Sequence, residues 1–194
     1  MKYLFFFLFL SAAQAQTTFH DEQFGFTVQE PKDWIKAEKN EAVENVKERI
    51  KLSEEKLNEL LKNNKGTIEI VTFYKYPVSS VNGVIPTIKV NLRKNPAKSI
   101  EDFKRMMEYS IGDIKKVFPK MTITKAPSIV QLDGKSAVYF ESLNVIPTKN
   151  GEEEVRTLTY AVPVGTNFYQ INFMDVKKDN CEKVFNETIN SIQL

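Results

Sequence analysis

The sequence has little of the chemistry on which most enzymes and metal proteins depend. Its 194 residues include one cysteine, Cys181, and one histidine, His20. A single cysteine cannot form an internal disulfide, and structural zinc sites normally draw four ligands from histidine and cysteine. His20 lies beside Asp21 and Glu22, and its place near the N-terminus indicates an exposed, flexible segment over residues 16–23 rather than a metal site. We therefore expect no bound metal and no cofactor.

Signature motifs for catalysis are also missing. The chain contains no glycine-rich phosphate loop, no G-x-S-x-G motif and no arrangement typical of a histidine-based triad. Histidine and cysteine are the commonest sources of acid, base and nucleophile chemistry near neutral pH. Cys181 falls on the apolar face of a predicted helix, where burial keeps a thiol neutral, although a position near the helix start could lower its pKa. The sequence therefore favours a protein that is not an enzyme.

The chain has no excess of one charge and no apolar run of transmembrane length. It carries 27 Lys and Arg against 25 Asp and Glu, which gives no reason to expect nucleic acid or an acidic membrane as partner. Residues 1–15, MKYLFFFLFLSAAQA, have the charged start, short apolar centre and small-x-small end of a signal peptide. We expect cleavage near Ala15-Gln16 and a soluble periplasmic or secreted product, without an integral membrane span. Residues 16–194 have the length of a single domain.

Three segments have the composition or apolar periodicity of helices. Residues 40–63 are rich in Glu, Lys and Leu and contain no Gly or Pro, and Ser53 leaves open whether they form one helix or two. Residues 99–118 place their apolar side chains on one face, and residues 179–192 do the same. The sequence therefore predicts helices in these three ranges.

Residues typical of helix ends flank two of these segments. Ser99 is expected to cap the start of the second helix and Pro119 to end it. Asp179 is expected to cap the third helix, with Glu182 where a capping box has an acidic residue.

Between the helices lie six segments with the character of strands. The separators Asp133-Gly134, Asn150-Gly151 and Gly165-Thr166-Asn167 are typical of hairpin turns, because glycine and asparagine accept positive φ. Short turns join antiparallel neighbours, so residues 121–174 are expected to form a meander. A longer loop over residues 76–86 contains Asn82-Gly83, a strong turn signal. The predicted strands cover 67–76, 87–94, 121–132, 135–146, 154–164 and 167–174.

An antiparallel sheet accompanied by helices with one apolar face each implies layers, with the helices packed over the sheet. The predicted fold class is therefore α+β: an antiparallel β-sheet flanked by helices as an α/β/α sandwich.

Several stretches in order resemble the PsbP-like superfamily, which includes photosystem II extrinsic subunits, a Ran-binding nuclear import factor and many bacterial exported proteins of unknown role. The first is FGFTVQEPKDW, residues 24–34, which resembles the entry strand of that family. The resemblance implies an antiparallel sheet sandwiched by helices, and it does not imply one function. The further matching stretches are IPTIKVNLRK, KSIEDFKRMME, LDGKSAVYFES, RTLTYAVPVGTNFYQINFM and VFNETINSIQL.

The entry stretch has an architectural interpretation. Phe24, Phe26 and Val28 alternate with small or polar residues and are expected to form an inward-facing strand row. Pro31 cannot donate a ladder hydrogen bond, so it should release the chain at the edge of the sheet. Trp34, the only tryptophan, would then cover one end of the core.

Four polar residues interrupt the predicted strands: Glu141, Arg156, Gln170 and Asn172. If they converge between sheet and helices they would line a ligand-binding pocket, with Glu141 and Arg156 paired. Alternatively they lie on a solvated edge or outer face, where an ion pair contributes little. The acids in KNGEEEV, residues 149–155, are expected to be part of a solvated turn.

Three functions compete on these observations. The first is an exported, non-enzymatic binding or accessory protein that contacts an envelope or secreted protein partner through a surface or groove. The second is a carrier of a small apolar or amphipathic ligand held between sheet and helices, for which the many aromatic residues could form a cavity. The third is an enzyme, which depends only on the pairing of Glu141 with Arg156.

Overall fold

The structure is a computed structural model that describes residues 17–38 and 66–194. The predicted signal peptide and the predicted helix or helices over 40–63 lie outside the described residues. The described elements are β1 (Thr18–Asp21), β2 (Phe26–Gln29), β3 (Ile35–Lys36), β4 (Ile68–Tyr74), the 3₁₀ turn η1 (Val78–Ser80), β5 (Thr87–Lys94), α3 (Ile100–Val117), β6 (Thr122–Leu132), β7 (Lys135–Thr148), β8 (Gly151–Val164), β9 (Asn167–Val176) and α4 (Glu182–Asn190).

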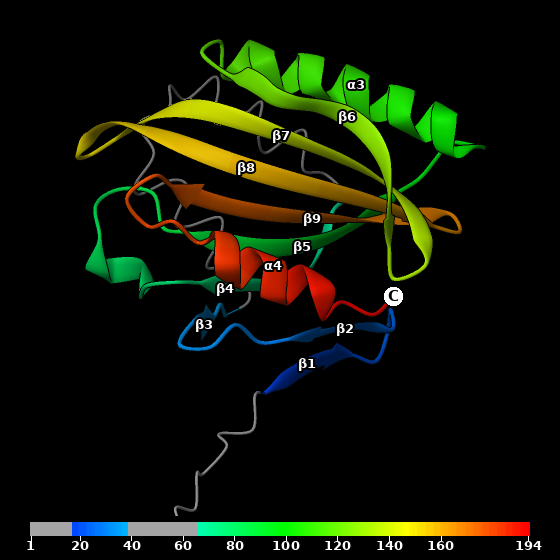
Figure 1. The fold of residues 1–194 in the computed structure, drawn as a ribbon, viewed down its shortest axis with the longest axis horizontal. Helices are drawn as coiled ribbons and strands as arrows, with labels where there is room; N and C mark the ends of the chain where they lie inside the picture. Colours follow the sequence, from blue (N-terminus) through cyan, green and yellow to red (C-terminus); the bar gives the residue numbers. More distant parts are fainter. Residues whose placement is uncertain (1–16, 39–65) are drawn as a thin grey trace, which may run out of the picture.

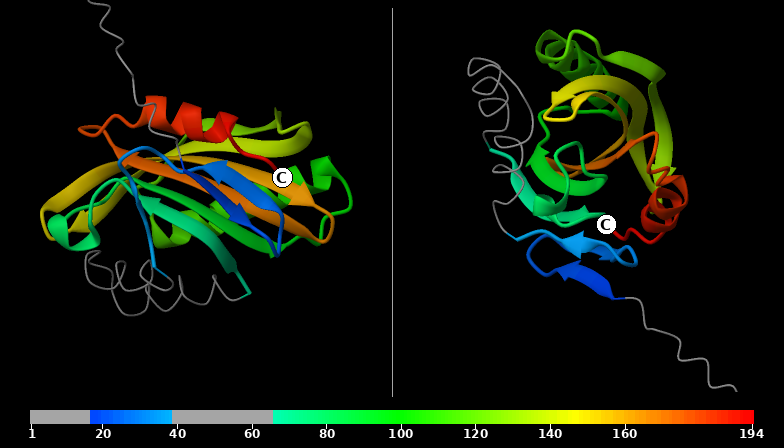
Figure 2. Two further views of the ribbon diagram at one scale, coloured as in Figure 1. Left: turned by 90° about the horizontal axis from the view of Figure 1, so that it is seen from below. Right: turned by 90° about the vertical axis from the view of Figure 1, so that its left-hand side faces the viewer.

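Seven of the strands form one antiparallel sheet in the order β3-β4-β5-β9-β8-β7-β6 (Figure 1). The strands β6 to β9 are sequential neighbours, so the predicted meander is confirmed. β9 then pairs with β5, which brings the first half of the chain into the same sheet. Figure 2 shows that the sheet is strongly twisted. The α+β expectation holds at this level: a mostly antiparallel sheet accompanied by helices.

The predicted hairpin turns have the backbone conformation that their residues favour. Asp133 and Gly134, between β6 and β7, have φ values of 48° and 70°. Positive φ at both central positions is the signature of the turn that matches the twist of adjoining strands. Glycine also takes positive φ in the two later turns, at Gly151 and Gly165.

The helix α3 begins as predicted. The Ser99 side chain accepts a hydrogen bond from the backbone N–H of Asp102 at 3.1 Å, and Pro119 follows the helix end. Phe103 and Met107 are buried against Val138, Ala161 and Phe168 of the sheet. The rings of Phe103 and Phe168 meet edge to face, with centroids 5.1 Å apart.

The start of α4 differs from the prediction. The helix begins at Glu182, its N-cap residue is Cys181, and no side-chain capping bond forms. Asp179 is not the cap, because its carboxylate accepts hydrogen bonds from Lys75 Nζ at 3.0 Å and Tyr76 Oη at 2.6 Å. The Cys181 N–H donates instead to Asp175 Oδ2 at 2.9 Å. The backbone N–H at the start of α4 thus has a carboxylate of β9 as its acceptor.

The entry stretch packs as an inward-facing element but outside the main sheet. Phe26 and Val28 are fully buried, yet the strand partner of β2 is β1, in a separate two-stranded sheet. Phe24 precedes β2 and lies half-buried against the same core. Its carbonyl accepts a hydrogen bond from Tyr169 Oη at 2.6 Å. The expected flexible segment was wrong for residues 18–21, because β1 pairs in register with β2.

Trp34 lies where the sequence predicted. Its ring contacts Phe185 of α4 edge to face, with centroids 6.2 Å apart, and it packs on the core between α4 and the sheet. The chain enters the main sheet only after Pro31, where β3 pairs with β4.

Strand alternation gives the sheet two faces of different character. The α4 face carries Ile88, Ile171 and Phe173, which join Phe26, Phe185 and others in one large apolar core. The α3 face carries Val138, Ala161 and Phe168, which α3 covers. Farther along the same strands, the α3 face carries polar side chains, and these side chains form the candidate site.

Candidate functional site

The structure divides the four predicted site residues between the two faces of the sheet. Gln170 pairs with Ala161, and Asn172 with Thr159, on the α3 face. Glu141 pairs with Leu158 on the α4 face, and Arg156 pairs there with Asp175. Of the two alternatives, convergence of all four in one pocket is therefore wrong, because the spacing of Gln170 and Asn172 places them on the opposite side from Phe173 and Asp175.

Glu141 interacts with two neighbours other than Arg156. Its carboxylate accepts a hydrogen bond from Tyr139 Oη and one from Lys125 Nζ at 2.9 Å. Partial burial raises the pKa of the Glu141 carboxyl, but these two hydrogen bonds outweigh that effect and hold it below its usual value. Lys125 also lies over the Tyr139 ring, 5.1 Å from its centroid. Glu141 and Lys125 therefore form a surface ion pair.

Arg156 forms a two-pronged ion pair with Asp175. Its Nε lies 3.0 Å from Oδ1 and its Nη2 2.9 Å from Oδ2. The Asp175 side chain is 2% exposed, whereas the Arg156 side chain is 32% exposed. Arg156 therefore compensates a buried carboxylate, and the expected pairing with Glu141 is replaced by this contact.

Gln170 and Asn172 line a pocket of about 280 Å³ between the α3 face and the C-terminal half of α3. This volume is close to the lower end of the range for small-molecule sites. The apolar part of the wall consists of Ile114, Met121, Phe140 and Met174. The polar part comes from the four strands β5, β9, β8 and β7, and consists of Thr87, Lys89, Gln170, Asn172, Thr157, Thr159, Ser142 and Asn144.

Six of the eight polar residues lie in two rows across the floor of this pocket. One row runs Thr87, Met174, Thr157, Ser142 across β5, β9, β8 and β7. The next runs Lys89, Asn172, Thr159, Phe140 in the same strand order. Thr87, Ser142 and Thr159 are buried. The pocket floor is thus built from hydroxyl and amide groups at the centre of the sheet.

Several of these polar groups already have partners. Thr159 Oγ1 donates to Asn172 Oδ1 at 2.9 Å, and Thr87 Oγ1 donates to the Ile85 carbonyl at 2.8 Å. Arg93 Nη1 donates to Gln170 Oε1 at 3.1 Å, and burial lowers the pKa of that guanidinium. Lys89 Nζ lies 2.6 Å from Glu69 Oε2.

Asn144 is the exception among the lining residues. Its Oδ1 atom is buried and has no hydrogen-bond partner. Leaving a buried acceptor without a donor costs about 1–3 kcal/mol. Three other buried side-chain oxygens in the described residues also lack a partner, on Thr67, Asn91 and Asp179, so the Asn144 oxygen does not by itself mark a ligand site.

Sequence reasoning found Gln170 and Asn172 but missed the hydroxyl residues beside them. Threonine and serine are common in strands, so Thr157, Thr159 and Ser142 gave no separate signal. The available signal was their register, since polar residues at alternate positions of adjacent strands mark one face. The pairings that align these three residues with Asn172 and Met174 lie within β7, β8 and β9, so the predicted meander contained this signal once its register was traced.

Another hollow of about 300 Å³ lies at the N-terminal half of α3. Its wall includes Met106, Met107 and Phe168, together with Arg93 and Ser110. It contains fewer hydrogen-bonding side chains than the pocket lined by Gln170 and Asn172, which we call the floor pocket, and we assign it no function.

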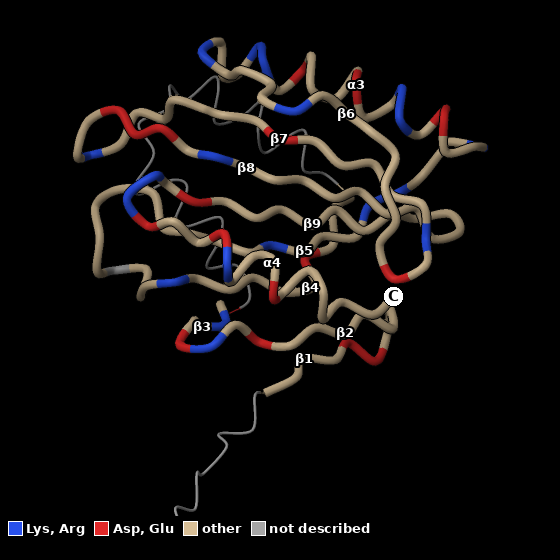
Figure 3. Tube along the Cα trace, viewed as in Figure 1, with Lys and Arg blue, Asp and Glu red and all other residues tan. Residues whose placement is uncertain are grey.

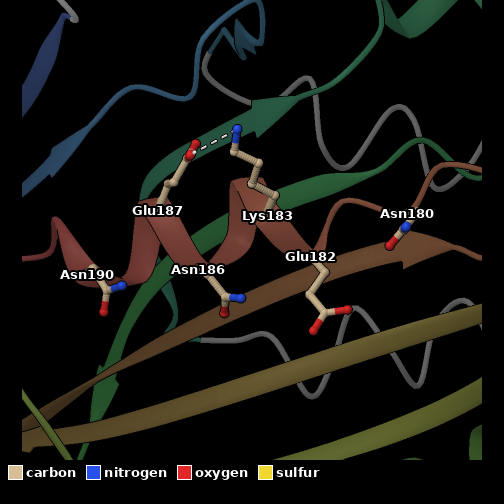
Figure 4. Close-up of a pocket in the computed structure, with 6 residues that line it drawn as sticks. All are labelled: Asn180, Glu182, Lys183, Asn186, Glu187 and Asn190. Carbon is tan, nitrogen blue, oxygen red and sulfur yellow. Dashed lines mark ion pairs between the residues drawn. The ribbon is translucent and has the colours of Figure 1, made fainter.

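The outer surface of α4 is polar and shows no enclosed site. Figure 4 shows that Glu182, Lys183, Asn186, Glu187 and other exposed side chains extend outward from one helix. Figure 3 shows both charge signs along α3 and along α4. This mixture is typical of a solvated surface.

The remaining reactive residues lie apart from the pocket wall. Burial raises the pKa of the Cys181 thiol to about 11, so the thiol is neutral at physiological pH. His20 is exposed on β1, with its Nδ1 2.8 Å from Thr27 Oγ1. In residues 17–38 and 66–194, no three His, Cys, Asp or Glu side chains are grouped so as to hold a metal ion. Glu153 accepts a hydrogen bond from the Val84 N–H at 2.6 Å, so part of the acidic turn is structural rather than merely solvated.

None of the helices in the described part of the chain combines the length and the apolar character needed to cross a membrane.

Comparison with known protein families and curated sequences gives no match. Solved structures give matches at low identity. Cyanobacterial PsbP (CyanoP) from Synechocystis sp. PCC 6803 is 13% identical, with a TM-score of 0.55 over 95% of each chain. LpqN of Mycobacterium tuberculosis, involved in cell envelope biogenesis, is 12% identical, with a TM-score of 0.48 over 94% of this chain and 86% of LpqN.

A protein from Bacteroides thetaiotaomicron is 14% identical, with a TM-score of 0.52 over 92% of this chain. The match covers 48% of that protein, so our chain spans about half its length. At these identities the similarity concerns the fold. Together with the antiparallel meander and the entry stretch, it shows that this chain has the PsbP-like fold.

Proposed function

We propose that this protein is an exported, non-enzymatic binding or accessory protein, and that the pocket between α3 and the sheet is its binding site. The observation that carries the proposal is the polar floor of that pocket, to which four strands contribute hydroxyl and amide side chains. We further propose that the domain as a whole is a complete α/β/α sandwich. The pattern of residues 1–15 supports export.

The polar floor is costly if its only role is to fill a core. Burying a hydroxyl or amide costs free energy unless a hydrogen bond compensates it. On the opposite face, the rows that cross the same strands contain Ile88, Phe173 and Leu158, or Val90 and Ile171. The sheet can therefore be packed with apolar residues at this depth. Its α3 face carries polar residues beside an open volume, as expected of a recognition site.

Within residues 17–38 and 66–194, the environments of the most reactive side chains support a binding role over a catalytic one. The thiol of Cys181 is buried in the core between α4 and the sheet. Glu141 is neutralised by Lys125 on the α4 face. The enzyme hypothesis depended on a Glu141–Arg156 pair, and each of these residues has another ionic partner.

Two kinds of occupant fit this proposal. The apolar wall formed by Ile114, Met121, Phe140 and Met174 favours a small apolar or amphipathic ligand, which makes a carrier role the second candidate. An envelope or secreted protein partner would instead insert one of its side chains. The volume of about 280 Å³ suits either a small molecule or a single inserted group.

Filling the pocket tests the proposal. Thr157→Phe places a large side chain on the floor, and Thr124→Phe makes the same change on an exposed position of β6 as control. Each purified chain, residues 16–194, is incubated with envelope extract of the source cells. Native mass spectrometry then detects small ligands, and crosslinking detects protein partners.

We expect the parent chain and Thr124→Phe to retain the same bound species, and Thr157→Phe to lose it. Circular dichroism checks that all three are folded. Equal retention by Thr157→Phe, or recovery of no bound species by either method, would reject the pocket as the binding site.

A further inference from the structure

The floor pocket has an excess of hydrogen-bond donors at the end formed by β5 and β9. Gln170 Oε1 accepts from Arg93, and a guanidinium can only donate, so the NH₂ group of this amide remains as a donor. Asn172 Oδ1 accepts from Thr159, which likewise leaves the Asn172 NH₂ group as a donor. In the described part of the chain, neither NH₂ group has an acceptor.

Lys89 adds a cationic donor beside these two amides. It lies directly opposite Asn172 in the pairing of β5 with β9, and Gln170 lies diagonally from it, two residues along β9. Diagonal neighbours of this kind are about 7–8 Å apart, which is within reach of long side chains. Glu69 Oε2 lies 2.6 Å from Lys89 Nζ, but an ammonium has three N–H donors, so two remain. Lys89, Asn172 and Gln170 are each partly exposed, so a ligand can reach all three.

The opposite end of the pocket is apolar. The row that begins with Lys89 and Asn172 continues through Thr159 to Phe140 on β7. Phe140 forms a cluster there with Met121, and Ile114 of α3 packs against this cluster. Neighbouring strands are about 4.8 Å apart, so β9 and β7 are separated by about 10 Å. A ligand that fits both ends therefore has an acceptor head and a short hydrocarbon body.

A carboxylate suits the donor end better than other small head groups. It offers two oxygens that only accept, whereas a neutral amide offers one such oxygen and an ammonium offers none. Of the twelve residues that line the pocket, Lys89 alone has an ionisable side chain, so the charge in this wall is positive. Hydrogen bonds between an ammonium and a carboxylate are about twice as strong as those between neutral groups.

We propose that the floor pocket binds a short apolar carboxylic acid as its carboxylate. This inference rests on the proposed function, because it names the ligand class for the carrier role of the same site. The carboxylate lies against Lys89, Asn172 and Gln170, and the hydrocarbon body extends across β8 toward Phe140.

Three isosteric probes test the head group: hexanoate, hexanamide and hexylammonium. Each is titrated at pH 7 into the ¹⁵N-labelled chain of residues 16–194. The side-chain NH₂ signals of Gln170 and Asn172 report contact at the donor end directly. We expect hexanoate to shift both signals saturably, with hexanamide and hexylammonium at least tenfold weaker.

Two substitutions at the Lys89–Glu69 pair should change hexanoate binding in opposite directions. Lys89→Gln removes the ammonium, and we expect hexanoate to bind this variant at least tenfold more weakly than the parent chain. Glu69→Gln retains an acceptor for Lys89 and Thr72 but removes the competing negative charge, so hexanoate should bind at least threefold more tightly. Lys98→Gln, at an exposed position, should leave binding unaltered. Loss of structure alone would not strengthen binding in Glu69→Gln.

The possible failures are distinct. If hexanamide or hexylammonium matches hexanoate, or if either variant of the pair binds hexanoate as the parent chain does, the carboxylate inference is wrong and the pocket stands as a binding site. If no probe shifts the two NH₂ signals at millimolar concentration, the carboxylate inference is also rejected. The retention experiment with Thr157→Phe then decides separately whether the pocket binds another species.

Discussion

At the scale of single residues, the most consequential contact is the ion pair between Arg156 and Asp175. Asp175 is almost completely buried, and it also accepts the Cys181 N–H at the start of α4. One carboxylate thus joins β8, β9 and α4. The sequence suggested a role for Arg156 but assigned it the wrong partner, because Asp175 reads as a loop residue beyond the predicted end of the last strand.

Asp175→Asn is expected to lower the free energy of unfolding by about 2–3 kcal/mol. Breaking a buried ion pair usually costs more, but the partial exposure of Arg156 reduces the loss. Urea unfolding followed by circular dichroism measures it. The control is Asp113→Asn on the exposed side of α3, where removing the pair with Lys116 should cost less than about 0.5 kcal/mol. Similar losses for the two variants would contradict this account.

The Cys181 thiol should be unreactive in the folded protein. Since its pKa is raised to about 11 by burial, only about one thiol in a thousand is ionised at pH 8. Labelling with a thiol reagent at pH 8 should therefore be slow, and should become fast in urea. The same shift predicts that the free energy of unfolding falls as pH rises from about 9 to 11, because only the unfolded thiol ionises there. Fast labelling without denaturant would show that the thiol is accessible and ionised.

At the scale of elements, the loop between β4 and β5 is held by one carboxylate of the opposite hairpin. Glu153 accepts the Val84 N–H at 2.6 Å, and Lys178 lies 3.6 Å from its other oxygen. A Cβ atom at Gly83 would come within 2.4 Å of Glu153 Oε1. An added methyl group would therefore displace this carboxylate from its contact with Val84. Val84 packs with Val155 and Val176, and this contact holds the loop beside the floor pocket.

This contact predicts a non-additive pair of substitutions. Gly83→Ala alone should destabilise the chain by about 1–3 kcal/mol, because the new methyl group meets Glu153. In a Glu153→Ala background the obstacle is absent, so the same change should cost about 1–2 kcal/mol less. A double-mutant cycle of unfolding free energies gives the coupling. Strict additivity would show that Gly83 is required for another reason.

At the scale of the whole molecule, the two faces of the sheet differ in what they tolerate. The α4 face is a continuous apolar core, and the α3 face joins an apolar patch under α3 to the polar floor. Val162 and Thr159 lie on the same strand, on opposite faces, and both are buried. Valine and threonine have nearly the same shape, so replacing each by the other compares an apolar with a polar side chain on each face.

Val162→Thr should cost about 2 kcal/mol, because it buries a hydroxyl in an apolar core. Thr159→Val should cost less than about 1 kcal/mol. It removes one hydrogen bond, and the Asn172 amide that loses its partner lies in the wall of the open pocket. Thermal unfolding of the two variants ranks them. The reverse order would mean that the polar floor is a structural requirement of the fold.

Much of this architecture follows from local pattern, and the rest depends on long-range pairing. Apolar periodicity and the Ser99 cap predicted α3, and the glycine turns predicted the meander, because both are decided by neighbours in sequence. Asp179 failed as a cap because Lys75 and Tyr76, about 100 residues away, engage it. Convergence of the site residues depended on strand parity across several pairings, which local reasoning did not track.

The N-terminal hairpin is closed by the end of the chain. Thr27 and Gln193 exchange backbone hydrogen bonds, the Gln29 N–H donates to Ser191, and the Leu194 N–H donates to Asp133. The backbone pairing of β2 is therefore completed by residues that lie more than 160 positions later in the sequence, so formation of this hairpin depends on a contact of very long range.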